Sequence, residues 1–106
     1  MPYIIGTMWY PSHKQGDAVK TYLKIRDKYP ADESLYEQRC APVMTTEKGI
    51  KLMSVWDVKA GKLEQALNRT SKFYYEFINV EGLEYKVEVW MTFEEAIGVA
   101  GIDIPE

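Results

Sequence analysis

The stretch that decides the fold is PYIIGTMWYP, residues 2–11, close to the start of the chain. Its two alternating sets of side chains are both apolar, with Ile4 and Met8 in one set and Ile5 and Trp9 in the other. A strand that is apolar on both sides is typical of the centre of a sheet, where both faces are covered. We therefore predict a central strand over these residues.

Three further stretches have strand patterns. Residues 50–59, IKLMSVWDVK, are again apolar in both alternating sets and predict a second central strand. Residues 35–46 contain Pro42, which cannot donate to a hydrogen-bond ladder and is tolerated mainly in an edge strand. Residues 83–93 alternate almost strictly between apolar and polar side chains, so we predict a half-covered strand at the opposite edge.

Two segments between these strands have helical spacing. Residues 17–29 carry apolar side chains at intervals of three and four; Asp17 is placed to cap the start of this helix, and Pro30 ends it. Residues 63–78 show the same spacing more cleanly, and Gly82 ends that segment.

The order strand, helix, strand, strand, helix, strand predicts an α+β fold. It is the ferredoxin-like βαββαβ arrangement, a four-stranded antiparallel sheet with two helices on one face. We expect the first and third strands to be central and parallel to each other, with antiparallel strands outside them. The 106 residues suffice for one packed domain. We assign residues 1–93 to it, and residues 94–106 to a tail of a short helical turn and an extended arm that packs on its own or a partner subunit.

Two helices on the same side cover only one face of the sheet. Both central strands, however, have apolar side chains on both faces. The outward residues are either Tyr3, Ile5 and Trp9 or Ile4, Met8 and Tyr10 in the first strand, and either Met53 and Val55 or Ile50, Leu52 and Trp56 in the third. Leaving such side chains in water forfeits roughly 1.5–3 kcal/mol each, and soluble monomers rarely expose large apolar patches. We therefore expect a homodimer formed through the sheet face that the helices leave bare.

With this element order and two doubly apolar strands, the chain resembles the dimeric α/β barrel superfamily, in which two ferredoxin-like protomers pack sheet to sheet. The resemblance spans residues 2–93. Members of that superfamily include small monooxygenases, cyclases, chlorite dismutases and ligand-sensing regulators. The resemblance therefore narrows the architecture far more than the activity.

His13, the single histidine, follows the first strand. If the first and third strands are parallel, their carboxyl ends share an edge, and His13 lies near Asp57 and both helix N-termini. A catalytic His13 and Asp57 acid–base pair, with pocket tyrosines, would then serve a cofactor-independent enzyme. The alternative is a solvated loop histidine. Because the chain lacks a histidine and cysteine cluster, we expect no zinc or haem site and no cofactor.

The many aromatic residues predict a cleft between sheet and helices that holds a flat organic molecule, with Arg39 anchoring an acidic group. The candidate ligand-binding residues are Trp9, Tyr22, Arg39, Trp56, Tyr74 and Tyr85. Core filling and a dimer interface explain the same aromatic residues without a ligand. Cys40 is either a reactive thiol beside Arg39 or a small buried hydrophobic residue, and Trp90, in the polar set of its strand, is a subunit contact or pocket rim.

The charge balance excludes several partners. Thirteen basic and sixteen acidic residues give a net charge of −3, which offers no attraction to nucleic acid or anionic membranes. We see no signal-peptide pattern and no apolar run long enough to cross a membrane, and a single cysteine forms no internal disulfide. We expect a cytoplasmic protein that binds neither nucleic acid nor membranes.

The predicted function of this protein is that of a small-molecule binding or sensing module. The alternatives are a monooxygenase-like or cyclase-like enzyme and a structural role in which the tail from Ile97 to Ile104 swaps onto a partner.

Overall fold

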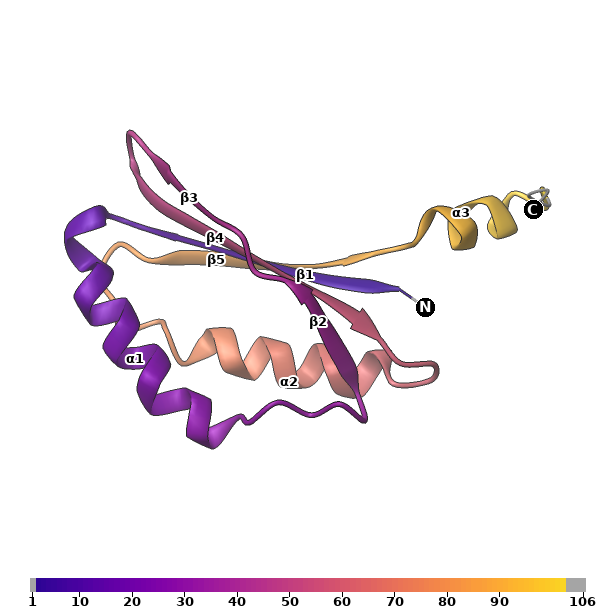
Figure 1. Cartoon of the computed structure of the whole chain (residues 1–106), viewed down its shortest axis with the longest axis horizontal. Coiled ribbons are helices and arrows are strands. Elements are labelled where there is room, and N and C mark those ends of the chain that lie inside the picture. Colours follow the sequence, from indigo (N-terminus) through magenta and orange to yellow (C-terminus); the bar gives the residue numbers. More distant parts are fainter. Residues whose placement is uncertain (1, 103–106) are drawn as a thin grey trace.

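The computed structural model describes residues 2–102. Its five strands form one antiparallel sheet, and helices α1 and α2 lie together on one face of it (Figure 1). The strands are β1 (Tyr3–Tyr10), β2 (Tyr36–Cys40), β3 (Val43–Thr46), β4 (Gly49–Val58) and β5 (Glu84–Trp90), and the helices are η1 (Ser12–Lys14), α1 (Gln15–Lys28), α2 (Leu63–Tyr75) and α3 (Phe93–Val99). The predicted α+β class is confirmed.

The predicted edge strand over residues 35–46 is two strands, because its backbone is interrupted. The pairing register shifts between Gln38 and Cys40, and β3 starts only after Pro42. A bulge bends a strand and a proline has no amide hydrogen for the ladder, so β2 and β3 pair with different parts of β4. The sheet therefore has five strands where the sequence predicted four.

The strand order β2-β4-β1-β5 places the two doubly apolar strands at the centre, as predicted. Their predicted parallel pairing is wrong, however, because β1 and β4 are antiparallel, with Tyr3 opposite Asp57 and Tyr10 opposite Ile50. The strands that run in the same direction as β1 are β2 and β3, which both pair with the far side of β4. The crossover through α1 leaves a gap between β1 and β2, and β4 fills it in the opposite direction.

The buried core lies between the sheet and the two helices. From β1 it contains Ile4, Met8 and Tyr10, and α2 contributes Ala66 and Tyr74. Because successive strand residues point to opposite faces, the other set of β1 side chains points away from the helices.

The helix ends differ in detail from the predictions. α1 begins at Gln15 with Lys14 in the N-cap position, so Asp17 is not the cap. Asp17 lies in the first turn, with its Oδ2 3.8 Å from the Nζ of Lys14. An acidic side chain there is still favourable, because it lies close to free amide groups. The regular part of α2 ends at Tyr75, and turns follow before Gly82, which has a φ of +80°.

Gly6 allows α2 to pack directly on the backbone of β1. A Cβ atom at this position would lie 2.2 Å from the Oη of Tyr74. Tyr74 is only 3% exposed, and its ring is stacked on Tyr85 with the centroids 5.5 Å apart. The absence of a side chain at Gly6 therefore fixes the distance between helix and sheet.

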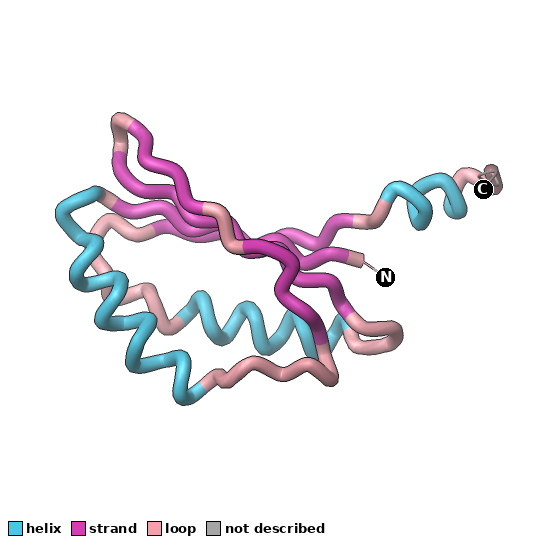
Figure 2. The backbone as a smooth tube through the Cα atoms, viewed as in Figure 1, coloured by secondary structure: helices cyan, strands magenta, loops and turns pink. Residues whose placement is uncertain are grey.

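Residues 91–102 form a segment, here called the C-terminal arm, that extends beyond the end of the sheet (Figures 1 and 2). Its helix α3 has a capping box: Thr92 Oγ1 accepts from the amide of Glu95, and Glu95 Oε1 accepts from the amide of Thr92. Residues 103–106, including Ile104 of the predicted tail, lie outside the described residues. No helix within residues 2–102 is long and apolar enough to cross a membrane.

Candidate functional site

The sheet face opposite the helices carries a band of apolar side chains. They come from the outward sets of β1 and β4, in which Ile5 is the register neighbour of Val55. We call this band the open-face stripe; its residues are Tyr3, Ile5, Trp9, Met53 and Val55. Met53 is 36% exposed, and the other four are partly buried. Both helices lie on the other side of the sheet (Figure 1), so neither of them covers the stripe.

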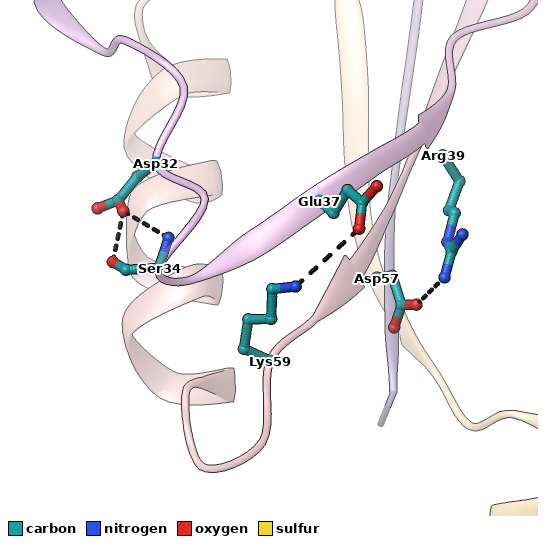
Figure 3. Close-up of polar contacts among 6 residues, drawn as sticks. All are labelled: Asp32, Ser34, Glu37, Arg39, Asp57 and Lys59. Atoms are coloured by element: carbon teal, nitrogen blue, oxygen red, sulfur yellow. Dashed lines mark hydrogen bonds and ion pairs between the residues drawn. The ribbon is translucent and has the colours of Figure 1, made fainter.

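Charged side chains of both signs border the open-face stripe. On the β5 side, the Nζ of Lys86 lies 3.5 Å from the Oε1 of Glu88. On the β2 side, Arg39 donates a hydrogen bond of 2.6 Å to Asp57, as Figure 3 shows. This hydrogen bond raises the pKa of Arg39 above its ordinary value, so the guanidinium stays charged. Each border therefore carries positive and negative charge, which a second copy of the same face can match.

A groove of about 250 Å³ lies at one end of the open-face stripe, and we call it the Trp9 groove. Its lining consists of Trp9, Tyr10, Thr46, Lys48, Gly49, Ile50, Lys51 and Lys86. Three lysines from the β3–β4 turn, β4 and β5 thus share a groove with one indole ring. Glu84, the register neighbour of Trp9, is the nearest acidic residue along β5. An aromatic surface beside ammonium groups suits a flat organic anion.

A second, larger groove runs along one side of α2, between this helix, Tyr29 and Tyr85. It has a volume of about 610 Å³, is open to solvent, and includes Tyr29, Tyr75 and Tyr85 in its lining. At its border Lys28 donates a 2.6 Å hydrogen bond to Glu76, which lowers the pKa of that carboxyl. Neither groove includes His13.

The antiparallel pairing of β1 and β4 separates His13 from Asp57. His13 lies in η1, after the C-terminal end of β1, whereas Asp57 pairs with Tyr3 at the opposite end. At roughly 3.4 Å per residue, the two ends of β1 are about 24 Å apart, which is far beyond the reach of a proton transfer. Asp57 instead binds Arg39. Within residues 2–102 no group of three or more histidine, cysteine or acidic side chains is placed to hold a metal ion.

Three of the six predicted ligand-binding residues come together between the sheet and the helices, and one of them, Tyr85, also lines the groove along α2. Trp56 meets Tyr74 edge to face at 6.3 Å, and Tyr74 stacks on Tyr85. Burial raises the pKa of Tyr74 to about 12, against the opposing effect of its hydrogen bond with Ser54. These rings pack on one another between the sheet and the helices, so the groove that includes Tyr85 lies beside this cluster.

The other three lie apart from that cluster and from one another. Tyr22 packs edge to face on Phe73 at 6.4 Å, Arg39 is on the edge strand β2, and Trp9 is on the opposite sheet face. Cys40 is exposed, so its prediction as a buried hydrophobic residue is wrong. It lies at the register shift of β2, where the strand is no longer held flat against β4.

The lysines of the Trp9 groove were missed at the sequence level, because they come from three separate segments. Their only signal is that Lys86 falls in the polar set of its strand, which is also the pattern of ordinary solvated residues. Lys51 shares its set with the apolar Met53 and Val55, and nothing in that pattern indicates a site. No protein-family model, curated protein or solved structure matches the chain.

Proposed function

We propose that this chain is a non-catalytic module that forms a homodimer through the open-face stripe and binds a small organic anion in the Trp9 groove. In this proposal the protomer is a variant of the ferredoxin-like βαββαβ fold. β2 and β3 act as one interrupted edge strand, and α3 is an addition after the last strand. The dimer is then of the dimeric α/β barrel type.

The single observation that carries the dimer is the open-face stripe. Its five side chains lie on the face that α1 and α2 leave bare, and Met53 is 36% exposed. Completing the burial of a large apolar side chain contributes roughly 1.5–3 kcal/mol, measured from full exposure. A second copy supplies an apolar band of the same shape, so one symmetric contact covers both stripes.

The charges around the stripe favour a twofold arrangement in which the strands of the two sheets run in opposite directions. The centre of β1 lies close to Gly6 and Thr7, which pair with Val87 and Lys86 of β5. A twofold axis through this centre and across the strands places Lys86 between the partner's Lys86 and the partner's Glu88. It also brings Lys51 over the end of β4 that carries the partner's Asp57. Opposite charges then face each other on the β4 side of the stripe.

The ligand part of the proposal rests on the composition of the Trp9 groove. A flat anion can lie against the indole of Trp9 while Lys48, Lys51 and Lys86 balance its charge. We do not propose the enzyme alternative, because the separation of His13 from Asp57 removes the acid–base pair on which it depended.

Oligomeric mass tests the dimer. Size-exclusion chromatography with light scattering, at micromolar concentration, should give twice the 12.3 kDa mass of the chain. Val55→Glu places a charge in the stripe and should give a monomer. Val19→Glu makes the same change on the outer side of α1, where Val19 is 46% exposed, and should leave the dimer intact. A monomeric wild type, or equal effects of both variants with their circular dichroism unchanged, contradicts the proposal.

Binding of anilinonaphthalene sulfonate, a flat aromatic anion, tests the ligand site. The wild-type dimer should bind this probe saturably, and Trp9→Ala should weaken binding about tenfold, which corresponds to about 1.4 kcal/mol. Tyr75→Ala, in the groove along α2, is the matched control and should bind as the wild type does. If both variants bind the probe equally, the Trp9 groove is not the site.

A further inference from the structure

The C-terminal arm and the end of β5 carry the longest run of exposed apolar side chains within residues 2–102. Trp90 is 52%, Met91 58% and Phe93 72% exposed, and beyond them Val99 is 79% and Ile102 62% exposed. Within one copy the arm, which follows Trp90 at the end of β5, extends beyond the sheet (Figure 2). A helix as short as α3 is unstable in water without tertiary contacts, even when its capping box is complete.

Trp90 connects this arm to the proposed dimer contact. It lies in the outward set of β5 together with Lys86 and Glu88, and it pairs with Tyr3 of the open-face stripe. The apolar surface of the arm is therefore continuous with the stripe. Any second copy that covers Tyr3 also meets Trp90.

We propose that the arm of each copy closes the Trp9 groove of the other copy, so that each ligand site is completed by its partner. This inference rests on the proposed dimer. When the two sheets run in opposite directions, the Tyr3 end of one copy lies over the Trp9 end of the other. The arm starts at the Tyr3 end, so it continues past Trp90 across the partner's Trp9 and the partner's β3–β4 turn.

The shape of the sheet and the charges of the arm match this placement. The β3–β4 turn projects to the side of the sheet away from the helices (Figure 1), where it borders the Trp9 groove. The turn and β4 bring Lys48 and Lys51, with Glu47 as the acidic neighbour. The first turn of α3 carries the exposed Glu94, whereas Glu95 is engaged in the capping box, and α3 has no basic residue in its last turn. Glu94 thus lies at the border of the partner's groove, beside the partner's Lys48, while Met91 and Phe93 form an outer wall opposite the partner's Trp9 and leave the space between them for the ligand.

Disulfide trapping tests the exchange directly. In a Cys40→Ser background, which removes the only natural thiol, Glu94→Cys is combined with Lys48→Cys and the protein is oxidised mildly. Within one copy these two positions lie beyond opposite ends of the sheet, so an intrachain bond is excluded by distance. We expect a covalent dimer on a non-reducing gel. The matched control pairs Glu94→Cys with Lys20→Cys, an exposed position on α1, and should stay uncrosslinked.

The same preparations separate the failure of this inference from the failure of the dimer. If light scattering shows a dimer but the first pair does not crosslink, or crosslinks no more than the control pair, the arm exchange is wrong and the dimer stands. If light scattering shows a monomer, both proposals are wrong. As a second measurement, a chain ending at Met91 should remain dimeric but bind anilinonaphthalene sulfonate about tenfold more weakly than the wild type. This loss corresponds to about 1.4 kcal/mol of binding free energy. Unchanged affinity in that shortened dimer also overturns the exchange.

Discussion

Gly6→Ala places a methyl group where the ring of Tyr74 already lies. The new Cβ would be 2.2 Å from Oη, 2.4 Å from Cε2 and 2.5 Å from Cζ of that ring. Favourable contacts between carbon atoms are about 3.5–4 Å long. Because Tyr74 is 3% exposed and stacked on Tyr85, the ring has no open space into which it can move. The substitution must therefore displace α2 or break the stack of rings.

Two effects of opposite sign determine the magnitude. Gly6 does not have a positive φ, so alanine is compatible with its backbone and by itself would stabilise the fold by about 0.4–1 kcal/mol. Overpacking a well-filled core costs about 1–3 kcal/mol. Three atoms of the Tyr74 side chain, two of them in the ring, lie within 2.5 Å of the new Cβ, which places this site at the upper end of that range. We expect Gly6→Ala to lower the free energy of unfolding by about 2 kcal/mol.

Urea unfolding at one fixed chain concentration measures this loss. Tyr74→Ala alone should cost about 3–5 kcal/mol, and Gly6→Ala added to it should be neutral or stabilising, because the conflicting ring is gone. Gly16→Ala in α1 is the matched control. A Cβ there meets no atom within 4 Å, so this variant should gain up to about 1 kcal/mol. A Gly6→Ala protein as stable as the wild type would refute the reasoning about close packing.

Three further predictions concern single polar groups. The hydroxyl of Thr70 is buried without a hydrogen-bond partner among the described residues, so Thr70→Val should raise stability to urea by about 1 kcal/mol, and a loss would show that the hydroxyl is satisfied. The hydrogen bond from Lys28 holds the pKa of Glu76 below its ordinary 4.5, so its contribution is present above that pH and is lost as the pH falls through the folded pKa. Glu76→Gln should therefore flatten the acid side of a plot of Tm against pH, and an unchanged acid side would contradict the pairing. Burial raises the pKa of Tyr74 from 10.0 to about 12, so the unfolded chain loses this proton first and stability falls as the pH rises between those values. Tyr74→Phe should reduce that loss of stability at alkaline pH. In a titration followed by phenolate absorbance, the tyrosine transition at the highest pH should be absent from this variant.

The local patterns of the sequence predicted the positions of the strands within the sheet. Residues 2–11 and 50–59 are apolar in both alternating sets, and they are the central strands β1 and β4. Pro42 predicted one edge correctly, and the strict alternation of residues 83–93 predicted the other. These predictions succeeded because the burial of a strand on one or two sides is written in its own side chains.

The candidate site was much less predictable, because it depends on strand direction and register. The sequence pattern is the same whether β4 runs parallel or antiparallel to β1, yet this direction decides whether His13 and Asp57 lie close together. It also decides whether Lys51 lies beside Trp9, which is its register neighbour. The sequence indicated which aromatic residues were candidates for a site. Which of them fill the core depends on which face of each strand is turned towards the helices.

By itself, the order of residues determined the α+β class and the two central strands with apolar side chains on both faces, since these follow from side-chain alternation along short segments. Only the tertiary structure decided that β4 runs against β1, that Tyr3, Ile5 and Trp9 face outward, and that three lysines surround one indole ring. Strand direction and register follow from how distant segments cross over and pack, and no short window of sequence contains that information.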